Sequence, residues 1–197
     1  FYTVEVVDPA LHTAHITIDI RNTSAFQELS LFIKTTEHLR YLISICNDGT
    51  NCPSLTYESH ILNFKAYNDK GHLLHTYNFN YVVNEAEVIN ERRISAQRAS
   101  SVKVEYDVVV LYPSVYGEDE VRTEAYLGTD YGIINEDFFF YRPDVDGSWA
   151  RSRRVQVRSI QVVFKLPVGW KAISVWAGDS MSFKVNDPVG FCTRCKG

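Results

Sequence analysis

The sequence predicts an all-β fold, an antiparallel β-sandwich of about ten to twelve strands with little helix. Apolar and polar residues alternate over residues 102–108 and again over residues 14–20, as expected for strands whose successive side chains point to opposite faces. The apolar runs are short and are separated by segments rich in Asn, Asp, Gly and Pro, which are turn residues. Few segments have the spacing of an amphipathic helix, so helix contributes little to the predicted fold.

The strand predicted at residues 102–111 is the centre of this fold. Its valine and tyrosine side chains fall on one face, and Lys103, Glu105 and Asp107 fall on the other. Burial of one large apolar side chain stabilises a fold by roughly 1.5–3 kcal/mol, so the apolar face can pack a sheet against a core. From Val109 onward both faces are apolar. This predicts that the strand runs beneath other structure and is not an edge strand.

The strands predicted before this centre follow from the same alternation. In chain order they are residues 2–6, 14–20, 29–33, 60–67 and 73–81, with a further apolar run at residues 39–45. The segment Asn68-Asp69-Lys70-Gly71 is a turn of the kind used in hairpins, so the two strands beside it are predicted to pair with each other. Between residues 84 and 101 charged side chains replace the alternation, which predicts either a short helix or a polar edge segment.

A long irregular region, residues 113–137, follows the central strand and is rich in Gly, Tyr and acidic residues. A loop of this length is uncommon unless it has a function. The aromatic run 138–141 comes next, and alternation resumes over residues 155–166 with a slip of phase at residues 158–159 that predicts a β-bulge. The last two strands are predicted at residues 170–176 and 181–185.

Length and composition fit one domain. The chain has 197 residues, of which 45% are hydrophobic, and a domain of this size buries roughly 70% of its unfolded surface. We predict a single β-sandwich over residues 1–190, followed at residues 191–197 by a tail or by the start of a junction to a further domain. The sequence begins at Phe1 without a methionine, so any signal peptide lies outside it.

Charge and hydropathy exclude two classes of partner. The net charge is −4 at pH 7 and the sequence pI is about 5.9, which gives no electrostatic reason to expect a nucleic acid or an anionic membrane surface. The longest apolar runs are far shorter than the roughly 20 residues that a transmembrane helix needs. The sequence therefore predicts no nucleic-acid partner and no membrane span.

The sequence shows no catalytic or metal-binding motif. A zincin-type metallopeptidase requires H-E-x-x-H, and none of the six histidines is followed by glutamate. His12 and His15 form one H-x-x-H pair and His72 and His75 form another, but residues three apart in a strand face opposite sides and cannot easily share a metal. No G-x-S-x-G motif and no phosphate-binding glycine loop is present. We therefore predict no catalytic residue, no metal ligand and no cofactor within this chain.

The four cysteines leave three interpretations open. Cys46 and Cys52 flank a turn-rich loop, and Cys192 and Cys195 form a single C-x-x-C near the end of the sequence. A Cys46–Cys52 disulfide would indicate an oxidising compartment, periplasmic or extracellular. A four-cysteine zinc site is the second interpretation. Free thiols in a cytosolic protein are the third, and a periplasmic or extracellular location is slightly favoured over a cytoplasmic one.

Four motifs together suggest a family. They are Y-T-V-E-V-V-D-P-A-L-H-T-A-H-I-T-I-D-I at residues 2–20, V-K-V-E-Y-D-V at residues 102–108, E-A-Y-L-G-T-D-Y-G-I-I-N-E-D-F-F-F-Y at residues 124–141 and V-V-F-K-L-P-V-G-W-K-A-I-S at residues 162–174. In order and approximate spacing this set resembles the N-terminal β-domain of the glycyl-aminopeptidase-like metallopeptidases. The chains of that family continue into a zinc-bearing thermolysin-like domain and often into a PDZ domain.

The resemblance implies a non-catalytic domain that packs against its own C-terminal peptidase domain and helps to shape the cleft for a peptide substrate. Zinc, its ligands and the general base would then lie in that missing catalytic domain. The segment F-K-V-N-D-P-V-G-F at residues 183–191 is similar to the junction between the two domains. The family's W-x-P-G-x-Y loop is not visible near residues 32–45, where the cysteine-flanked segment 46–53 stands instead. This departure leaves open the ligand-facing role of that loop.

Asn135 and Glu136 in the long loop are the candidate substrate-facing residues. Loops on a rigid sheet often carry function, and a carboxylate is a suitable partner for the ammonium group of a peptide's amino terminus. The alternative is a structural loop in which Tyr131 and residues 138–141 plug one end of the sandwich. The alternative function is a free-standing secreted β-sandwich module that binds protein or carbohydrate.

Overall fold

The computed structural model describes residues 1–7, 11–35, 61–84, 87–109, 126–127, 132–133, 139–143, 157, 159–172, 177–178 and 181–185. The secondary-structure elements of these residues are twelve strands, which confirms the all-β prediction. They are β1 (Tyr2–Glu5), β2 (Thr13–Arg21), β3 (Leu29–Thr35), β4 (Ile61–Asn68), β5 (Thr76–Asn84), β6 (Glu87–Ile94), β7 (Ser101–Val109), β8 (Tyr126–Leu127), β9 (Gly132–Ile133), β10 (Ile160–Lys165), β11 (Ala177–Gly178) and β12 (Ser182–Val185).

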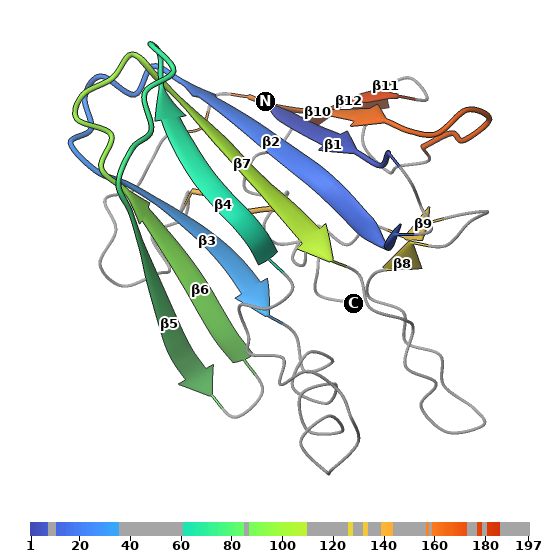
Figure 1. The fold of residues 1–197 in the computed structure, drawn as a ribbon, viewed down its shortest axis with the longest axis horizontal. Coiled ribbons are helices and arrows are strands. Elements are labelled where there is room, and N and C mark those ends of the chain that lie inside the picture. The colour runs from blue at the N-terminus through green and yellow to red at the C-terminus, as the bar shows by residue number, and fades with distance from the viewer. Residues whose placement is uncertain are drawn as a thin grey trace.

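The strands form a seven-stranded sheet in the order β11-β12-β10-β1-β2-β7-β4, a three-stranded sheet in the order β3-β6-β5, and the β8-β9 pair (Figure 1). Buried side chains of the two larger sheets belong to one hydrophobic cluster, so they share a core. As predicted, β7 has a neighbour on both sides and buries Val102, Val104, Tyr106 and Val108 on one face.

One strand pairing differs from the antiparallel prediction. β1 and β10 run parallel, with Tyr2 opposite Val162 and Glu5 opposite Lys165, so the seven-stranded sheet is mixed. Parallel strands need a crossover connection, and alternation within a strand says nothing about the direction of its neighbour. The two strands are far apart in the chain, because β1 ends at Glu5 and β10 begins at Ile160.

The hairpin predicted for residues 60–67 and 73–81 is wrong beyond its turn. The turn itself forms, because the Asn68 side-chain oxygen accepts hydrogen bonds from the backbone N–H groups of Lys70 and His72, and Gly71 adopts a φ of 76°. Only the bridge between Tyr67 and Leu73 joins the two arms. β4 then pairs with β7 in the large sheet and β5 pairs with β6 in the small one, because each arm finds a full-length partner by following the bend of the β6–β7 segment.

The charged stretch at residues 84–101 is neither a helix nor an edge segment. It contains β6, which is the middle strand of the three-stranded sheet and pairs with β3 and β5. Both faces of this strand carry polar side chains, so its sequence lacks the alternation that marks a half-buried strand. One ion pair and two cation–π contacts accommodate the charges of Glu91, Arg92 and Arg93 in the sheet, as described below.

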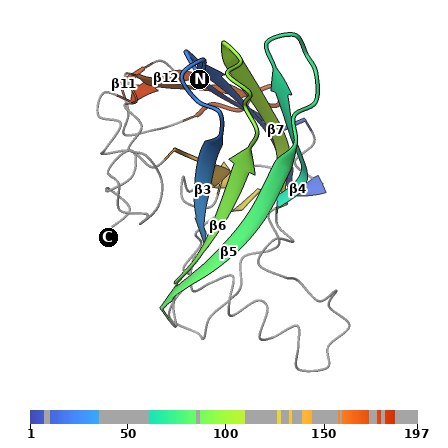
Figure 2. The ribbon, with the colours of Figure 1, turned by 90° about the vertical axis from the view of Figure 1, so that its left-hand side faces the viewer.

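Three segments carry the chain from one sheet to the other at a common end, which we call the corner (upper left in Figure 1). Residues 22–28 connect β2 to β3, residues 69–75 connect β4 to β5, and residues 95–100 connect β6 to β7. Figure 2 shows β3, β6 and β5 side by side below this bend. Across it the register barely changes: Arg21 pairs with Ser101 before the bend, and Leu29 pairs with Ile94 after it, so seven residues oppose six. Bends with one extra residue are a usual way for strands to switch sheets.

Hydrogen bonds hold the corner together. The backbone N–H of Thr23 donates to the carbonyl of Ser100 at 3.2 Å, and its hydroxyl donates to the carbonyl of Ala99 at 2.6 Å. The side-chain carboxylate of Asp69, in the segment 69–75, accepts hydrogen bonds from both the backbone N–H and the hydroxyl of Ser100. The bend requires left-handed backbone at Gln97 and Arg98, whose φ angles are 51° and 60°. Residues with a Cβ atom adopt this conformation only at a cost in free energy.

Of the remaining strand predictions, four are confirmed, one is contradicted over its first three residues, and others are untested. The strands predicted at residues 2–6, 14–20, 29–33 and 181–185 are present. Of the strand predicted at residues 170–176, Trp170–Ala172 form no strand, and the backbone N–H of Trp170 instead closes a turn on the carbonyl of Pro167 at 3.0 Å. Residues 39–45, most of the loop 113–137, and Arg158 of the predicted bulge lie outside the described residues.

The left-handed backbone at Arg98 generates a test. Arg98→Gly should raise the free energy of unfolding by about 1 kcal/mol, because glycine adopts positive φ without the Cβ penalty. Urea unfolding followed by circular dichroism measures this change. Ser24→Gly is the matched control, since Ser24 is exposed at the same corner and is not among the residues with positive φ; it should lower stability. Equal losses of unfolding free energy in Arg98→Gly and Ser24→Gly would show that the backbone of Arg98 is not strained.

Candidate functional site

The residues singled out from the sequence lie mostly outside the part of the chain that the structure describes. This holds for Asn135 and Glu136, for Cys46 and Cys52, and for the tail 191–197. Their substrate-facing and disulfide roles therefore stay predictions. Within the described ranges no three His, Cys, Asp or Glu side chains gather as a metal site would require, and no helix of those ranges has the length and hydropathy to cross a bilayer.

A buried aromatic segment, Phe139–Tyr141, lies between the two sheets and is tied to both. The Tyr106 hydroxyl donates a hydrogen bond to the carbonyl of Phe139 at 2.7 Å and accepts one from the backbone N–H of Tyr141 at 3.1 Å. The Tyr2 hydroxyl donates to the carbonyl of Tyr141 at 3.0 Å. These tyrosines belong to β7 and β1, so the large sheet holds the backbone of the segment.

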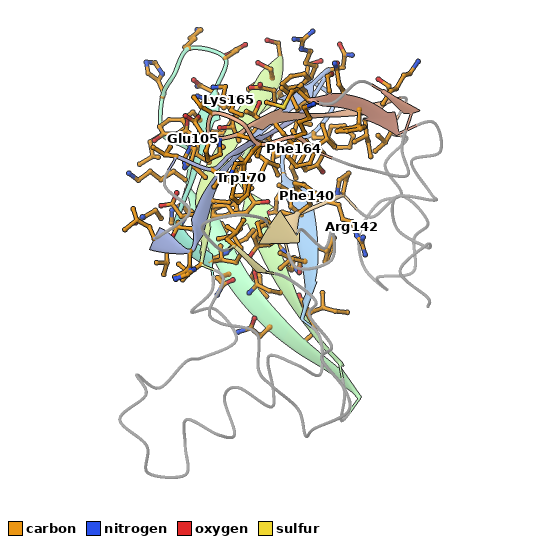
Figure 3. All side chains as sticks on the ribbon, turned by 90° about the vertical axis from the view of Figure 1, so that its right-hand side faces the viewer. Glu105, Phe140, Arg142, Phe164, Lys165 and Trp170 are labelled. Atoms are coloured by element: carbon orange, nitrogen blue, oxygen red, sulfur yellow. The ribbon has the colours of Figure 1, made fainter. Side chains whose placement is uncertain are left out.

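The next residue of this segment extends the small sheet. Arg142 and Phe32 of β3 form an antiparallel bridge, with N–H to carbonyl distances of 2.7 and 2.9 Å. Figure 3 shows Phe140 and Arg142 beside this strand. The prediction that the aromatic run plugs the sandwich agrees with the burial of Phe139, Phe140 and Tyr141, whereas Tyr131 and Phe138 lie outside the described residues.

A polar cluster surrounds the Tyr141 hydroxyl, and we call it the Arg92 cluster. The hydroxyl donates a short hydrogen bond to the side-chain oxygen of Asn90. The Asn90 side-chain nitrogen in turn donates to the side-chain oxygens of Asn78 and Asn80, each at 2.7 Å. The Arg92 Nε donates to the Tyr141 hydroxyl at 3.4 Å. The members are Arg92, Asn78, Asn80, Asn90, Tyr141 and Phe64, whose ring lies 5.0 Å beneath the Arg92 guanidinium carbon.

The chemistry of the Arg92 cluster is that of binding. It contains three amides, a hydroxyl and a guanidinium, but its members include no carboxylate or imidazole that could act as a general base. Arginine stays protonated at all physiological pH values. The cluster can therefore donate hydrogen bonds and present positive charge, without a group that activates a nucleophile.

The opposite face of β6 carries a second, self-contained group. Glu91, which is 4% exposed, accepts hydrogen bonds from Arg93 Nε at 2.7 Å and from the Tyr81 hydroxyl at 2.6 Å. Burial acts to raise the pKa of Glu91, but hydrogen bonds from Arg93, Tyr81 and Ser30 outweigh it, so the pKa lies below its ordinary value. The same hydrogen bond to Glu91 raises the pKa of Arg93. The pair is ionised at neutral pH.

An exposed aromatic row lies beside this group on β5: Tyr77, Phe79 and Tyr81, which are 45%, 36% and 40% exposed. The three share one face because they alternate along the strand. The Arg93 guanidinium carbon lies 4.3 Å from the centre of the Phe79 ring. The row is an apolar patch flanked by charge.

The outer face of the large sheet carries a third polar group. His15 Nδ1 lies 2.7 Å from one carboxylate oxygen of Asp107, and the Asn63 side chain donates to the other at 2.6 Å. Cross-strand pairing continues this row to Glu5 opposite His15 and to Lys165, whose ammonium lies 3.4 Å from the Glu5 carboxylate. The row crosses five strands: hydrogen bonds join its members on β4, β7 and β2, and an ion pair joins those on β1 and β10.

The Arg92 cluster is not evident from the sequence because its members come from four separate segments of the chain: β4, β5, β6 and the aromatic segment that contains Tyr141. A usable signal was present: Asn78, Asn80, Asn90 and Arg92 are polar residues spaced by two within extended segments. That spacing puts polar groups on a single face, and in β6 this is the face that also carries the buried Ile94 of the core.

Comparison with known proteins gives a likeness of fold. No family model matches this sequence, and no curated protein matches it. The structure is similar to part of the crystal structure of an aminopeptidase N family protein from Idiomarina loihiensis, with a TM-score of 0.57 and 15% sequence identity. The match covers 94% of this chain and 27% of that chain. The chain thus spans about a quarter of the length of that protein.

The Tyr106 hydroxyl generates a second test. Tyr106→Phe should lower the free energy of unfolding by about 1–3 kcal/mol, because it removes two buried hydrogen bonds between the Tyr106 hydroxyl and the backbone of Phe139 and Tyr141. Urea denaturation measures the loss. Tyr77→Phe, at a tyrosine with an exposed side chain, is the control and should change stability by less than about 0.5 kcal/mol. Equal effects would contradict the role of the hydroxyl.

The lowered pKa of Glu91 predicts a dependence of stability on pH. Ionised Glu91 stabilises the fold above the unfolded-state pKa of about 4.3, and this contribution disappears as the pH falls through the lower folded-state pKa. The difference in unfolding free energy between the wild type and Glu91→Gln should therefore shrink from pH 7 to pH 3. Glu28→Gln, at an exposed position, is the control. A difference for Glu91→Gln that stays constant with pH would refute the prediction.

Proposed function

We propose that this chain is a non-catalytic N-terminal domain of a zinc aminopeptidase, which packs against the peptidase domain and helps to shape its substrate cleft. The observation that carries the proposal is the likeness of fold: 94% of this chain matches 27% of a larger aminopeptidase N family protein. The four motifs that resemble the glycyl-aminopeptidase-like metallopeptidases support the same assignment from the sequence.

The chemistry of the described residues is compatible with an accessory role. The Arg92 cluster contains hydrogen-bond donors and a cation but no carboxylate or imidazole among its members, and the described residues hold no group of three metal-ligating side chains. Under this proposal the zinc ion, its ligands and the general base belong to the peptidase domain. The peptide substrate would meet this chain only through residues that line the cleft, among which we propose Asn135 and Glu136.

The aromatic row of β5 supports packing against another domain. Tyr77, Phe79 and Tyr81 expose apolar area on one strand face, and aromatic side chains are enriched where protein surfaces pack together. The same row also favours the second candidate, a free-standing module that binds protein or carbohydrate. The two candidates differ in whether the natural gene encodes a peptidase after this segment.

The first experiment reads the natural gene beyond the codon for Gly197. We expect an open reading frame that continues and encodes H-E-x-x-H, the helix-borne zinc motif of a thermolysin-like peptidase. A stop codon directly after Gly197 would contradict the proposal and favour the free-standing module.

The second experiment assays the isolated chain with amino-terminal peptide substrates and added zinc. We expect no turnover and far less than one zinc ion per chain after dialysis, measured by elemental mass spectrometry. The corresponding longer gene product, purified in the same way, is the positive control. Turnover by the isolated chain that persists through further purification would refute its non-catalytic role.

A further inference from the structure

We propose that the Arg92 cluster binds a carboxylate group, carried by a peptide or by a small organic acid. The assignment stands on residues of this chain and is independent of the proposed function. It begins from a contrast along one strand. Arg93 is paired with Glu91 at 2.7 Å and also donates to the Tyr81 hydroxyl, whereas Arg92, one residue earlier and on the other face of β6, contacts no carboxylate among the described residues.

The Arg92 guanidinium has donors to spare. An arginine side chain carries five N–H groups. One of them, on Nε, donates to the Tyr141 hydroxyl at 3.4 Å, and the guanidinium carbon lies over the Phe64 ring. The terminal nitrogens make no hydrogen bond to a described residue. Arg92 is partly buried, and a carboxylate offers its free terminal nitrogens two parallel charge-assisted hydrogen bonds.

The hydrogen bonds within the cluster fix its polarity. The Tyr141 hydroxyl donates to Asn90, and Asn90 donates to the side-chain oxygens of Asn78 and Asn80. The acceptor oxygens of all three amides are therefore engaged inside the cluster. Asn78 and Asn80 also make further contacts, so the ligand is placed on Arg92 itself. A site whose acceptors are engaged and whose charge is positive selects an anion.

The number of charges selects a carboxylate over a phosphate. Arg92 is the only cationic member of the Arg92 cluster, so it balances a monoanion, whereas a phosphate dianion would keep an uncompensated charge in a partly buried site. The planar fork of a guanidinium also matches the two oxygens of a carboxylate. The Phe64 ring covers the guanidinium from one side, with 5.0 Å between the guanidinium carbon and the ring centre, and a side chain restricted in this way loses less entropy on binding.

The direct test follows the Arg92 Nε–Hε resonance by nuclear magnetic resonance while sodium acetate, or an N-acetylated dipeptide with a free carboxyl group, is added at constant ionic strength. We expect a saturable shift with the carboxylates and none with sodium chloride or the dipeptide amide. The Arg93 Nε–Hε resonance is the internal control and should not shift. Saturation by the dipeptide acid but not by acetate assigns the carboxylate to a peptide, and equal saturation by both assigns it to organic acids in general.

Two variants complete the test. Arg92→Gln should abolish the saturable shifts of backbone amides near the cluster, and Arg92→Lys should weaken binding by about tenfold or more, because an ammonium lacks the planar fork. Backbone amide spectra establish that each variant folds. If Arg92→Gln does not fold, binding by Arg92→Lys and the Arg92 Nε–Hε resonance of the wild type test the assignment. A shift that never saturates, saturation by phosphate alone, or unchanged binding in Arg92→Lys would overturn the assignment.

Discussion

The structure depends on the hydrogen bonds made by one fully buried hydroxyl group, that of Tyr106. It satisfies a carbonyl and an N–H of the segment between the sheets, and buried backbone polar groups must be paired in a stable fold. Burial raises the pKa of this hydroxyl well above its ordinary value, so it stays protonated and able to donate. The segment can therefore place three aromatic rings in the core and still carry Tyr141 to the polar cluster beyond it.

The corner imposes the second constraint. The three connections of the corner bend together, and the register of the strands is nearly the same on both sides of the bend. The two sheets are therefore better described as one bent ribbon of strands than as two separate layers. This explains why a polar strand such as β6 is stable in the middle of a sheet: its register continues that of β7, which buries Val102, Val104 and Tyr106. The bend also brings Phe64 of β4 against Arg92 of β6, although these two strands belong to different sheets.

The sequence predicted those features whose cause is local. Alternation located β2 and β7, because each has one apolar face, and Asn68 to Gly71 predicted a turn. Prediction from the sequence failed where contacts with other strands determine the pairing. The turn at residues 68–71 could not show that the strands on its two sides enter different sheets, and no local pattern sets β1 parallel to β10. The Arg92 cluster was not predicted, because a polar residue in a strand indicates a solvent-facing position unless its partners are known. Asn135 and Glu136 lie outside the described residues and stay predictions.

The parallel pairing of β1 with β10 has a consequence for synthesis on the ribosome. β1 is synthesised shortly before β2 and pairs with it along one edge, yet its other edge is completed only by residues 160–165, which are synthesised much later. Until then a nascent chain carries an open strand edge of the kind that recruits other chains, and contacts between such distant residues form slowly. During translation, the open edge of β1 is therefore covered only after the much later segment that forms β10 has been synthesised.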